Sequence, residues 1–167
     1  MEAGHVMRIG LIGDTHDRLP AIAELVGQMI KGGAGMILHV GDYCSPFSLR
    51  AFEDAQVSLA GIFGKNDGDH QGLVSRAQSA FGSELFESPH SFEISGRRIL
   101  LVHDIADVQD HPRTTLRHLG DQLGDRRKPI VRVAYQSNPH HVPRFHSGFA
   151  ISCRMRSSYV SRAVTTA

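Results

Sequence analysis

Cysteine and long hydrophobic runs are both scarce in this sequence. Only Cys44 and Cys153 occur among the 167 residues, which is too few to predict a disulfide framework. The sequence has no run of about 18 consecutive apolar residues and no apolar signal region after its start, so it predicts neither a membrane span nor a secretory signal. We therefore expect a cytoplasmic protein.

Acidic side chains are missing from the last part of the chain. All 17 Asp and Glu residues lie within residues 1–125, whereas 8 of the 18 Lys and Arg residues lie within residues 126–167. We therefore divide the chain into a domain at 1–125 and a basic C-terminal segment at 126–167. Such a segment can bind nucleic acid or an acidic surface, but this one carries no recognisable nucleic-acid motif. A coding rearrangement or frameshift that replaced the original end ranks above nucleic-acid binding as an explanation.

The pattern of hydrophobic residues indicates an α/β fold. Four short apolar runs have the length and composition of buried strands, at residues 8–12, 36–40, 57–63 and 98–102. Helical spacing of apolar residues between them predicts helices at 20–31 and 46–54. Strands that alternate with helices predict a parallel sheet flanked by helices. Residues 84–95 and 97–102, which are separated by Gly96, predict a hairpin that begins a second sheet.

A small polar cluster follows each apolar run. These clusters are Gly-Asp-Thr-His at 13–16, Gly-Asp at 41–42, Gly-Lys-Asn-Asp at 64–67 and His-Asp at 103–104. Ligands of open α/β sheets bind at the carboxyl ends of the strands, so we expect the clusters to lie together. A neutral imidazole suits Mn, Fe, Zn or Ni, and a carboxylate can hold two cations. Two ions roughly 3.5–4 Å apart can clamp the attacking and leaving oxygens of a phosphoester. The sequence therefore predicts a two-metal hydrolytic site.

The order of these clusters resembles that of the calcineurin-like metallophosphoesterases, and more narrowly their small bacterial and archaeal phosphodiesterase branch. The family pattern is D-x-H, then G-D, then G-N-D or G-N-H, then a histidine after a strand, and finally G-H-x-H. The resemblance covers residues 7 to about 104. Each motif is weak alone, but four of them in order at strand ends are specific. The resemblance implies an α/β sandwich of two sheets flanked by helices, and we expect the C-terminal part to be truncated or rearranged.

The resemblance also implies a metal-binding role for each matching residue. Asp14 and His16 would hold the first metal ion. Asp42 would bridge both ions, while Asn66 and His103 would hold the second. We expect two divalent ions, with Mn²⁺ as the first choice and Ni²⁺, Fe²⁺ or Zn²⁺ as alternatives, because the ligand types do not decide among them.

Asp67 is the predicted catalytic residue. It takes the place where relatives often have a histidine that assists the leaving group. Structural explanations stay open for several of these positions. Asp14 could be a loop residue before a helix, Asn66 could belong to a turn before Gly68, and His103 could be a hydrogen-bonded histidine at a strand end. Cys44 could approach the metals, but the role of a small buried filler ranks first.

The chain departs from the family pattern after His103. The closing G-H-x-H motif, which would give one histidine to each metal, is absent, and Asp104 and Ile105 replace the usual Gly-His. The only later pair of histidines, His140 and His141, is flanked by prolines. Adjacent residues of an extended segment point to opposite sides, so the two cannot both reach one pocket without a turn. One of the two, with His141 as the first choice, stays a candidate metal ligand.

The leading hypothesis is a metal-dependent phosphodiesterase in which a metal-bound hydroxide attacks a phosphoester small molecule or a nucleotide-like substrate. The alternative is a catalytically weak scaffold that keeps the fold and binds proteins. Nucleic-acid binding through the basic tail ranks third, and no membrane partner is expected. The intact clusters up to His103 favour the first hypothesis, and the missing closing motif favours the second.

Overall fold

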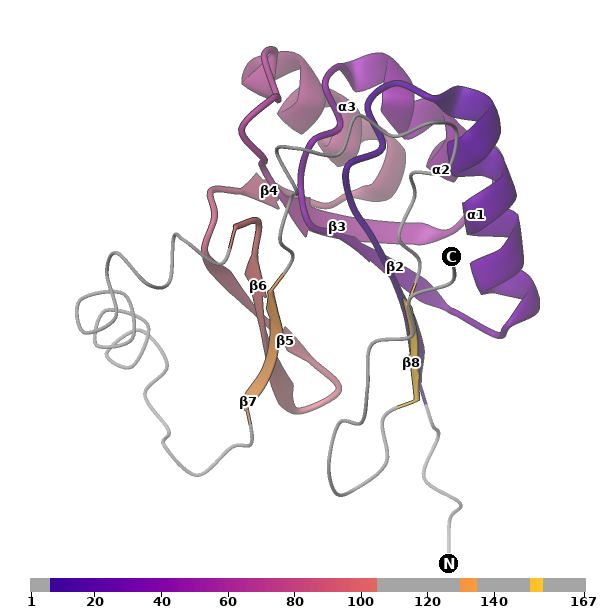
Figure 1. Cartoon of the computed structure of the whole chain (residues 1–167), viewed down its shortest axis with the longest axis vertical. Coiled ribbons are helices and arrows are strands. Elements are labelled where there is room, and N and C mark those ends of the chain that lie inside the picture. The colour runs from indigo at the N-terminus through magenta and orange to yellow at the C-terminus, as the bar shows by residue number, and fades with distance from the viewer. Residues whose placement is uncertain (1–6, 105–129, 135–150, 155–167) are drawn as a thin grey trace, which may run out of the picture.

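A computed structural model describes residues 7–104 and two later strands. Its strands are β1 (Arg8–Ile12), β2 (Met36–His39), β3 (Ser58–Ile62), β4 (Leu85–Phe86), β5 (His90–Ile94), β6 (Arg97–Val102), β7 (Ile130–Ala134) and β8 (Ile151–Arg154). They form a five-stranded sheet in the order β4-β3-β2-β1-β8 and a three-stranded sheet in the order β5-β6-β7 (Figure 1). From β4 to β1 the neighbouring strands are parallel, and β8 is antiparallel to β1.

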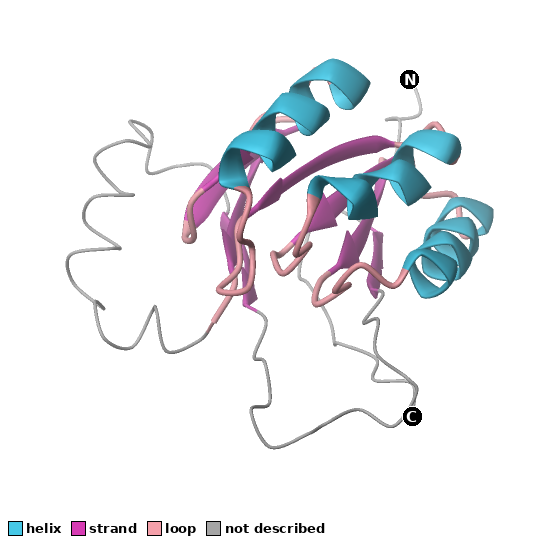
Figure 2. Cartoon of the chain, turned by 90° about the horizontal axis from the view of Figure 1, so that it is seen from above, coloured by secondary structure: helices cyan, strands magenta, loops and turns pink. Residues whose placement is uncertain are grey.

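The helices are α1 (Leu19–Lys31), the short 3-10 helix η1 (Pro46–Leu49), α2 (Arg50–Asp54) and α3 (His70–Phe81). They lie together on one face of the larger sheet (Figure 2). The helix predicted at 20–31 is confirmed as α1, and the one predicted at 46–54 is divided between η1 and α2. In the described part of the chain, no helix combines the length and the apolar character that crossing a membrane requires.

Both faces of the larger sheet are buried. On one face, Ile12 and Ile37 pack with the helices. On the other, Leu11 and Leu38 pack with Leu101 of β6 in the smaller sheet. Because side chains alternate along a strand, β1, β2 and β3 must be apolar on both sides, which explains their nearly continuous hydrophobic runs. The predicted α/β fold with a parallel sheet flanked by helices is confirmed.

The predicted hairpin is present, but its first strand is shorter than expected. β5 and β6 pair in antiparallel register around Ser95 and Gly96, whose φ angles of 50° and 71° suit a tight hairpin turn. Leu85 and Phe86, which the prediction included in the hairpin, instead pair with β3 in the other sheet. β7 and β8 belong to the basic segment, and β7 pairs in parallel with β6. His140 and His141 lie outside the described residues.

Candidate metal centre

The polar clusters after β1, β2, β3 and β6 meet at one edge of the fold. Backbone hydrogen bonds tie the first two loops together. The N–H of Asp14 donates to the carbonyl of Gly41 at 3.1 Å, and the N–H of His16 donates to the carbonyl of Asp42 at 3.1 Å. The loops that carry Asp14, His16 and Asp42 are therefore one hydrogen-bonded unit, as the shared sheet edge leads one to expect.

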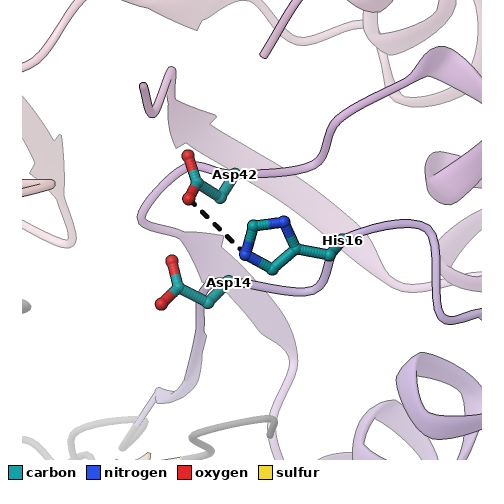
Figure 3. Close-up of side chains that lie close together, drawn as sticks. All are labelled: Asp14, His16 and Asp42. Carbon is teal, nitrogen blue, oxygen red and sulfur yellow. Dashed lines mark ion pairs between the residues drawn. The ribbon is translucent and has the colours of Figure 1, made fainter. Parts of the chain in front are cut away.

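Asp14, His16 and Asp42 form a compact group of donor atoms. One ligand atom from each residue lies within 4.8 Å of the others. Figure 3 shows the His16 ring directed at the Asp42 carboxylate, and Nε2 of His16 is 3.6 Å from Oδ2 of Asp42. Asp42 is buried, whereas the other two are partly exposed. The group is therefore open to solvent on one side.

His103 approaches the same carboxylate from the second sheet. Its Nε2 is 3.5 Å from Oδ1 of Asp42, and its Nδ1 lies 2.8 Å from the carbonyl oxygen of Val40. Because a carbonyl only accepts, Nδ1 carries a proton, and Nε2 is the nitrogen that faces Asp42. The backbone N–H of His103 donates to Oγ of Ser88 at 3.0 Å. The two oxygens of Asp42 thus face two different imidazoles.

Asn66 binds both oxygens of Asp42. Its backbone N–H donates to Oδ1 at 2.9 Å and its side-chain Nδ2 donates to Oδ2 at 2.7 Å. Burial by itself would raise the pKa of Asp42, but the two bonds from Asn66 and the nearby His103 and His16 outweigh burial, and the pKa lies below its usual value. A half-turn of the Asn66 amide exchanges its nitrogen and oxygen, so the same side chain can present an oxygen donor.

The spacing of these atoms suits a divalent cation. Two donors that each lie roughly 2.1 Å from one ion at a tetrahedral angle are roughly 3.4 Å apart. The distances from Asp42 to His16 and His103, 3.6 and 3.5 Å, are close to that value. Both are longer than a normal N–H···O hydrogen bond, which ends near about 3.2 Å. Because carboxylates and imidazoles are also a donor set that Mn²⁺, Fe²⁺, Ni²⁺ and Zn²⁺ accept, the residues fit a divalent metal.

Two glycines allow the loops to come this close. A Cβ on Gly64 would overlap Oδ1 and the backbone N of Asp42 and would lie 2.8 Å from Cε1 of His103. A Cβ on Gly41 would lie 2.5 Å from the backbone N of Gly64, and Gly41 also has a φ of 101°. Both positions therefore need glycine, one for space alone and one for space and conformation.

Left-handed backbone is concentrated at this edge. Asp14, His16, Asp17, Asp42 and Cys44 have φ angles between 44° and 71°. A non-glycine residue in this region costs on the order of 1–3 kcal/mol unless its surroundings compensate. Hydrogen bonds to side chains supply part of that compensation, for example the bond of 2.7 Å from Ser45 to Asp17. Such clusters of strained residues are typical of functional sites.

Cys44 contacts a predicted ligand. Its Sγ lies 3.1 Å from Nδ1 of His16. Burial, followed by the carboxylates of Asp17 and Asp42, raises the pKa of Cys44 to about 11. Cys44 is therefore a neutral thiol at neutral pH, and its sulfur can fix the orientation of the His16 ring.

The sequence did not predict the contact between His39 and Thr15, two residues that are buried beneath the site. His39 is fully buried between Tyr43, whose ring stacks on it at 3.7 Å, and Phe52. Its Nδ1 accepts from the N–H of Gly41 at 3.1 Å, so its Nε2 carries the proton that bonds Oγ1 of Thr15 at 3.0 Å. These contacts join the loop after β1 to the loop after β2. The missed signal is a polar residue inside an apolar strand, just before the Gly-Asp motif.

The free energy of unfolding should fall as the pH drops below about 6.5, partly because of His39. Burial lowers the pKa of His39 from 6.5 to about 3. At pH values between these two, the unfolded chain therefore binds a proton at this residue and the folded chain does not. This residue should therefore remove about 1 kcal/mol of stability between pH 7 and pH 5.5. Urea unfolding at both pH values measures the change. His39→Gln should reduce this change in the free energy of unfolding.

Lys65 separates this chain from the strict family pattern. It stands between Gly64 and Asn66, so the segment reads G-K-N-D where the pattern has asparagine directly after glycine. Its Nζ lies 2.6 Å from Oδ2 of Asp104, the residue after His103. The loops after β3 and β6 are therefore also joined by an ion pair at the rim of the site.

The fold and this donor group agree with a comparison to known protein families. The chain matches the calcineurin-like phosphoesterase superfamily domain over residues 7–132. It therefore belongs to the calcineurin-like phosphoesterase family. Membership of this family implies that divalent metal ions are the cofactors. The match runs past the end of the domain predicted at 1–125.

Individual relatives show the same kinship. The chain is 27% identical over 97 residues to a phosphodiesterase of Methanocaldococcus jannaschii. The aligned region covers 58% of this chain and 58% of that protein. It thus spans less than two thirds of this curated relative. Among solved structures, an archaeal phosphodiesterase matches 75% of this chain and 82% of its own with a TM-score of 0.57 at 19% identity. A Thermus thermophilus protein matches 83% and 71% with a TM-score of 0.52 at 16% identity. Both structures share the fold.

Proposed function

We propose that this chain is a metal-dependent phosphodiesterase that uses two divalent ions. The observation that carries the proposal is the position of the Asp42 carboxylate, which directs one oxygen at His16 and the other at His103. A carboxylate in that position can serve two cations at once. Membership of the phosphoesterase family and the likeness to a phosphodiesterase support the reaction class.

Each residue of the site has a distinct part in this proposal. Asp14 and His16 would hold one ion, and Asp42 would bridge to the second. Asn66 and His103 would complete the second position. When bound, the two ions would acidify a water molecule and stabilise the charge that develops on the phosphoryl oxygens. The chain itself fixes the ring of His103 through Val40 and orients Asp42 through Asn66.

We propose Mn²⁺ as the metal, with Ni²⁺, Fe²⁺ and Zn²⁺ as alternatives. The donors are carboxylates, imidazoles and an amide, a mixture of hard oxygen and borderline nitrogen ligands that favours these ions over Ca²⁺. We propose a phosphoester small molecule or a nucleotide-like diester as the substrate and the cytoplasm as the compartment. The role of Asp67 in assisting the leaving group stays a prediction.

A catalytically weak protein-binding scaffold is the second candidate. One sequence observation favours it, namely the absence of the closing G-H-x-H motif from the chain. Fewer imidazoles fix the ions less firmly, and a reacting group that is poorly positioned reacts slowly. This candidate predicts metal binding without useful turnover.

Metal content and turnover of the purified full chain test the proposal together. We expect about two equivalents of Mn²⁺ by equilibrium dialysis, hydrolysis of bis(4-nitrophenyl) phosphate that rises steeply with added Mn²⁺, and loss of both after EDTA treatment. Asp14→Asn should weaken the metal binding, whereas Asp54→Asn, at an exposed position where the carboxylate pairs with Arg50, should not. Metal binding with no turnover of any phosphodiester or phosphomonoester would favour the scaffold, and failure to bind metal would reject the proposed function.

A further inference from the structure

We propose that Asp67 is a positioning residue, which locks the loop carrying Asp42 against the loop carrying Asn66. This inference rests on the proposed function, because the group that it positions is the carboxylate assigned there to both metal ions. It gives Asp67 a task other than proton transfer to a leaving group.

Asp67 binds backbone N–H groups of two different loops. Its side chain is buried, with 7% of the residue exposed. Oδ2 accepts from the N–H of Asp42 at 3.1 Å and from the N–H of Gly64 at 2.7 Å. Oδ1 accepts from the N–H of Cys44 at 2.8 Å. One carboxylate thus connects the turn after β2 to the turn after β3.

The contacts between the two loops are reciprocal. Asp67, on the loop after β3, accepts from the backbone of Asp42. In return Asp42, on the loop after β2, accepts from the backbone and side chain of Asn66. Each carboxylate therefore satisfies the backbone donors of the loop that carries the other. A shift of either loop would break bonds at both carboxylates, so the orientation of Asp42 depends on Asp67.

The local backbone explains why this position needs an anion. Asp42 and Cys44 have φ angles of 61° and 71°, and in such turns neighbouring N–H groups converge on one point. If one of these N–H groups were buried without a hydrogen-bond partner, the folded state would lose about 1–3 kcal/mol of stability. A carboxylate satisfies three of them, and hydrogen bonds to a charged acceptor are roughly twice as strong as neutral ones.

The same contacts weigh against proton donation by Asp67. A general acid must direct a protonated oxygen at the leaving group, within about 2.6–3.2 Å. Both oxygens of Asp67 are instead directed at backbone N–H groups. The two roles predict different behaviour when the carboxylate is replaced.

Asp67→Asn in the full chain separates the two roles. The asparagine keeps the size of the side chain but turns an NH₂ group toward a backbone N–H, so one bond is lost and two donors oppose each other. We expect Mn²⁺ affinity to fall roughly 10–100-fold, as is typical when a residue that orients a metal ligand is replaced. Saturating Mn²⁺ should restore much of the turnover. The matched control is Asp69→Asn, because Asp69 caps α3 through the N–H of Gly72 and asparagine caps equally well.

A series of phosphodiesters with leaving groups of different acidity provides the second readout. If Asp67 only positions Asp42, the mutation should lower turnover by the same factor for nitrophenyl and for alkyl esters. A loss confined to alkyl esters, with Mn²⁺ affinity within about twofold of the wild type, would overturn the inference and establish Asp67 as the proton donor.

Amide exchange of the unmodified protein tests the contacts even if the variant does not fold. The N–H groups of Asp42, Cys44 and Gly64 should exchange slowly with solvent, because all three are bonded to a buried carboxylate. Fast exchange at these three amides would overturn the inference. A wild-type chain that keeps slow exchange but binds no Mn²⁺ would reject the proposed function and leave the contact between the loops established.

Discussion

Replacing Asp42 by asparagine is expected to remove one of two bound metal ions and to lower kcat/KM by on the order of 10³-fold, which is about 4 kcal/mol at 1.36 kcal/mol for each factor of ten. An amide has a single oxygen, so it cannot offer one anionic oxygen to each of two cations. The fold should survive, because the remaining oxygen can still accept the 2.9 Å bond from the N–H of Asn66.

Metal stoichiometry of the purified variant is the decisive measurement for Asp42. Circular dichroism and thermal unfolding establish that the variant is folded. Asp54→Asn, at an exposed acidic residue of α2, is the matched control and should keep both metal equivalents. Two metal equivalents retained by the Asp42 variant would show that this carboxylate does not bridge.

Gly64→Ala is the second change with a large expected effect. The added methyl group would overlap Oδ1 and the backbone N of Asp42, and backbone atoms cannot rotate away as a flexible side chain can. We expect a loss of about 1–3 kcal/mol in the free energy of unfolding, as for other overpacked sites. Mn²⁺ binding should also be weakened, because the methyl group pushes on the carboxylate itself.

Gly68→Ala is the control for this substitution. Gly68 lies in the same loop, but a Cβ there would have no atom within 4 Å. This variant should keep the stability and the Mn²⁺ affinity of the wild type. Equal behaviour of the two alanine variants in urea unfolding and metal titration would contradict the close approach of the loops after β2 and β3.

Much of the fold was predictable because it depends on local patterns. The apolar runs predicted both ends of β1, β2, β3 and β6 to within one residue, and the spacing of apolar residues predicted α1. α3 was not predicted because only Leu73 and Ala77 of its 12 residues are buried, so its hydrophobic pattern is weak. Its start was nevertheless encoded by Asp69, whose side chain accepts from the N–H of Gly72.

The site was predictable in its residue types but not in its contacts. The positions of Asp14, His16 and Asp42 at strand ends indicated a common edge, and the structure brings these three together. The bonds of Asp67 to three backbone N–H groups were not predictable, because they depend on left-handed turns after β2 that no residue pattern marks. The partnership of His39 and Thr15 was missed for a similar reason, since it forms across two strands.

The order of the site residues along the chain has a consequence for folding during synthesis. Asp14, His16, Asp42 and Asp67 all precede α3, whereas His103 follows β6 in the other sheet. Domains generally fold as units, and contacts between residues distant in sequence are slow to form because they close long loops. A nascent chain that ends after α3 therefore contains Asp14, His16 and Asp42 but lacks both His103 and the strand that covers the second face of the sheet. The ring of His103 arrives last, when the second sheet covers the apolar face of the first.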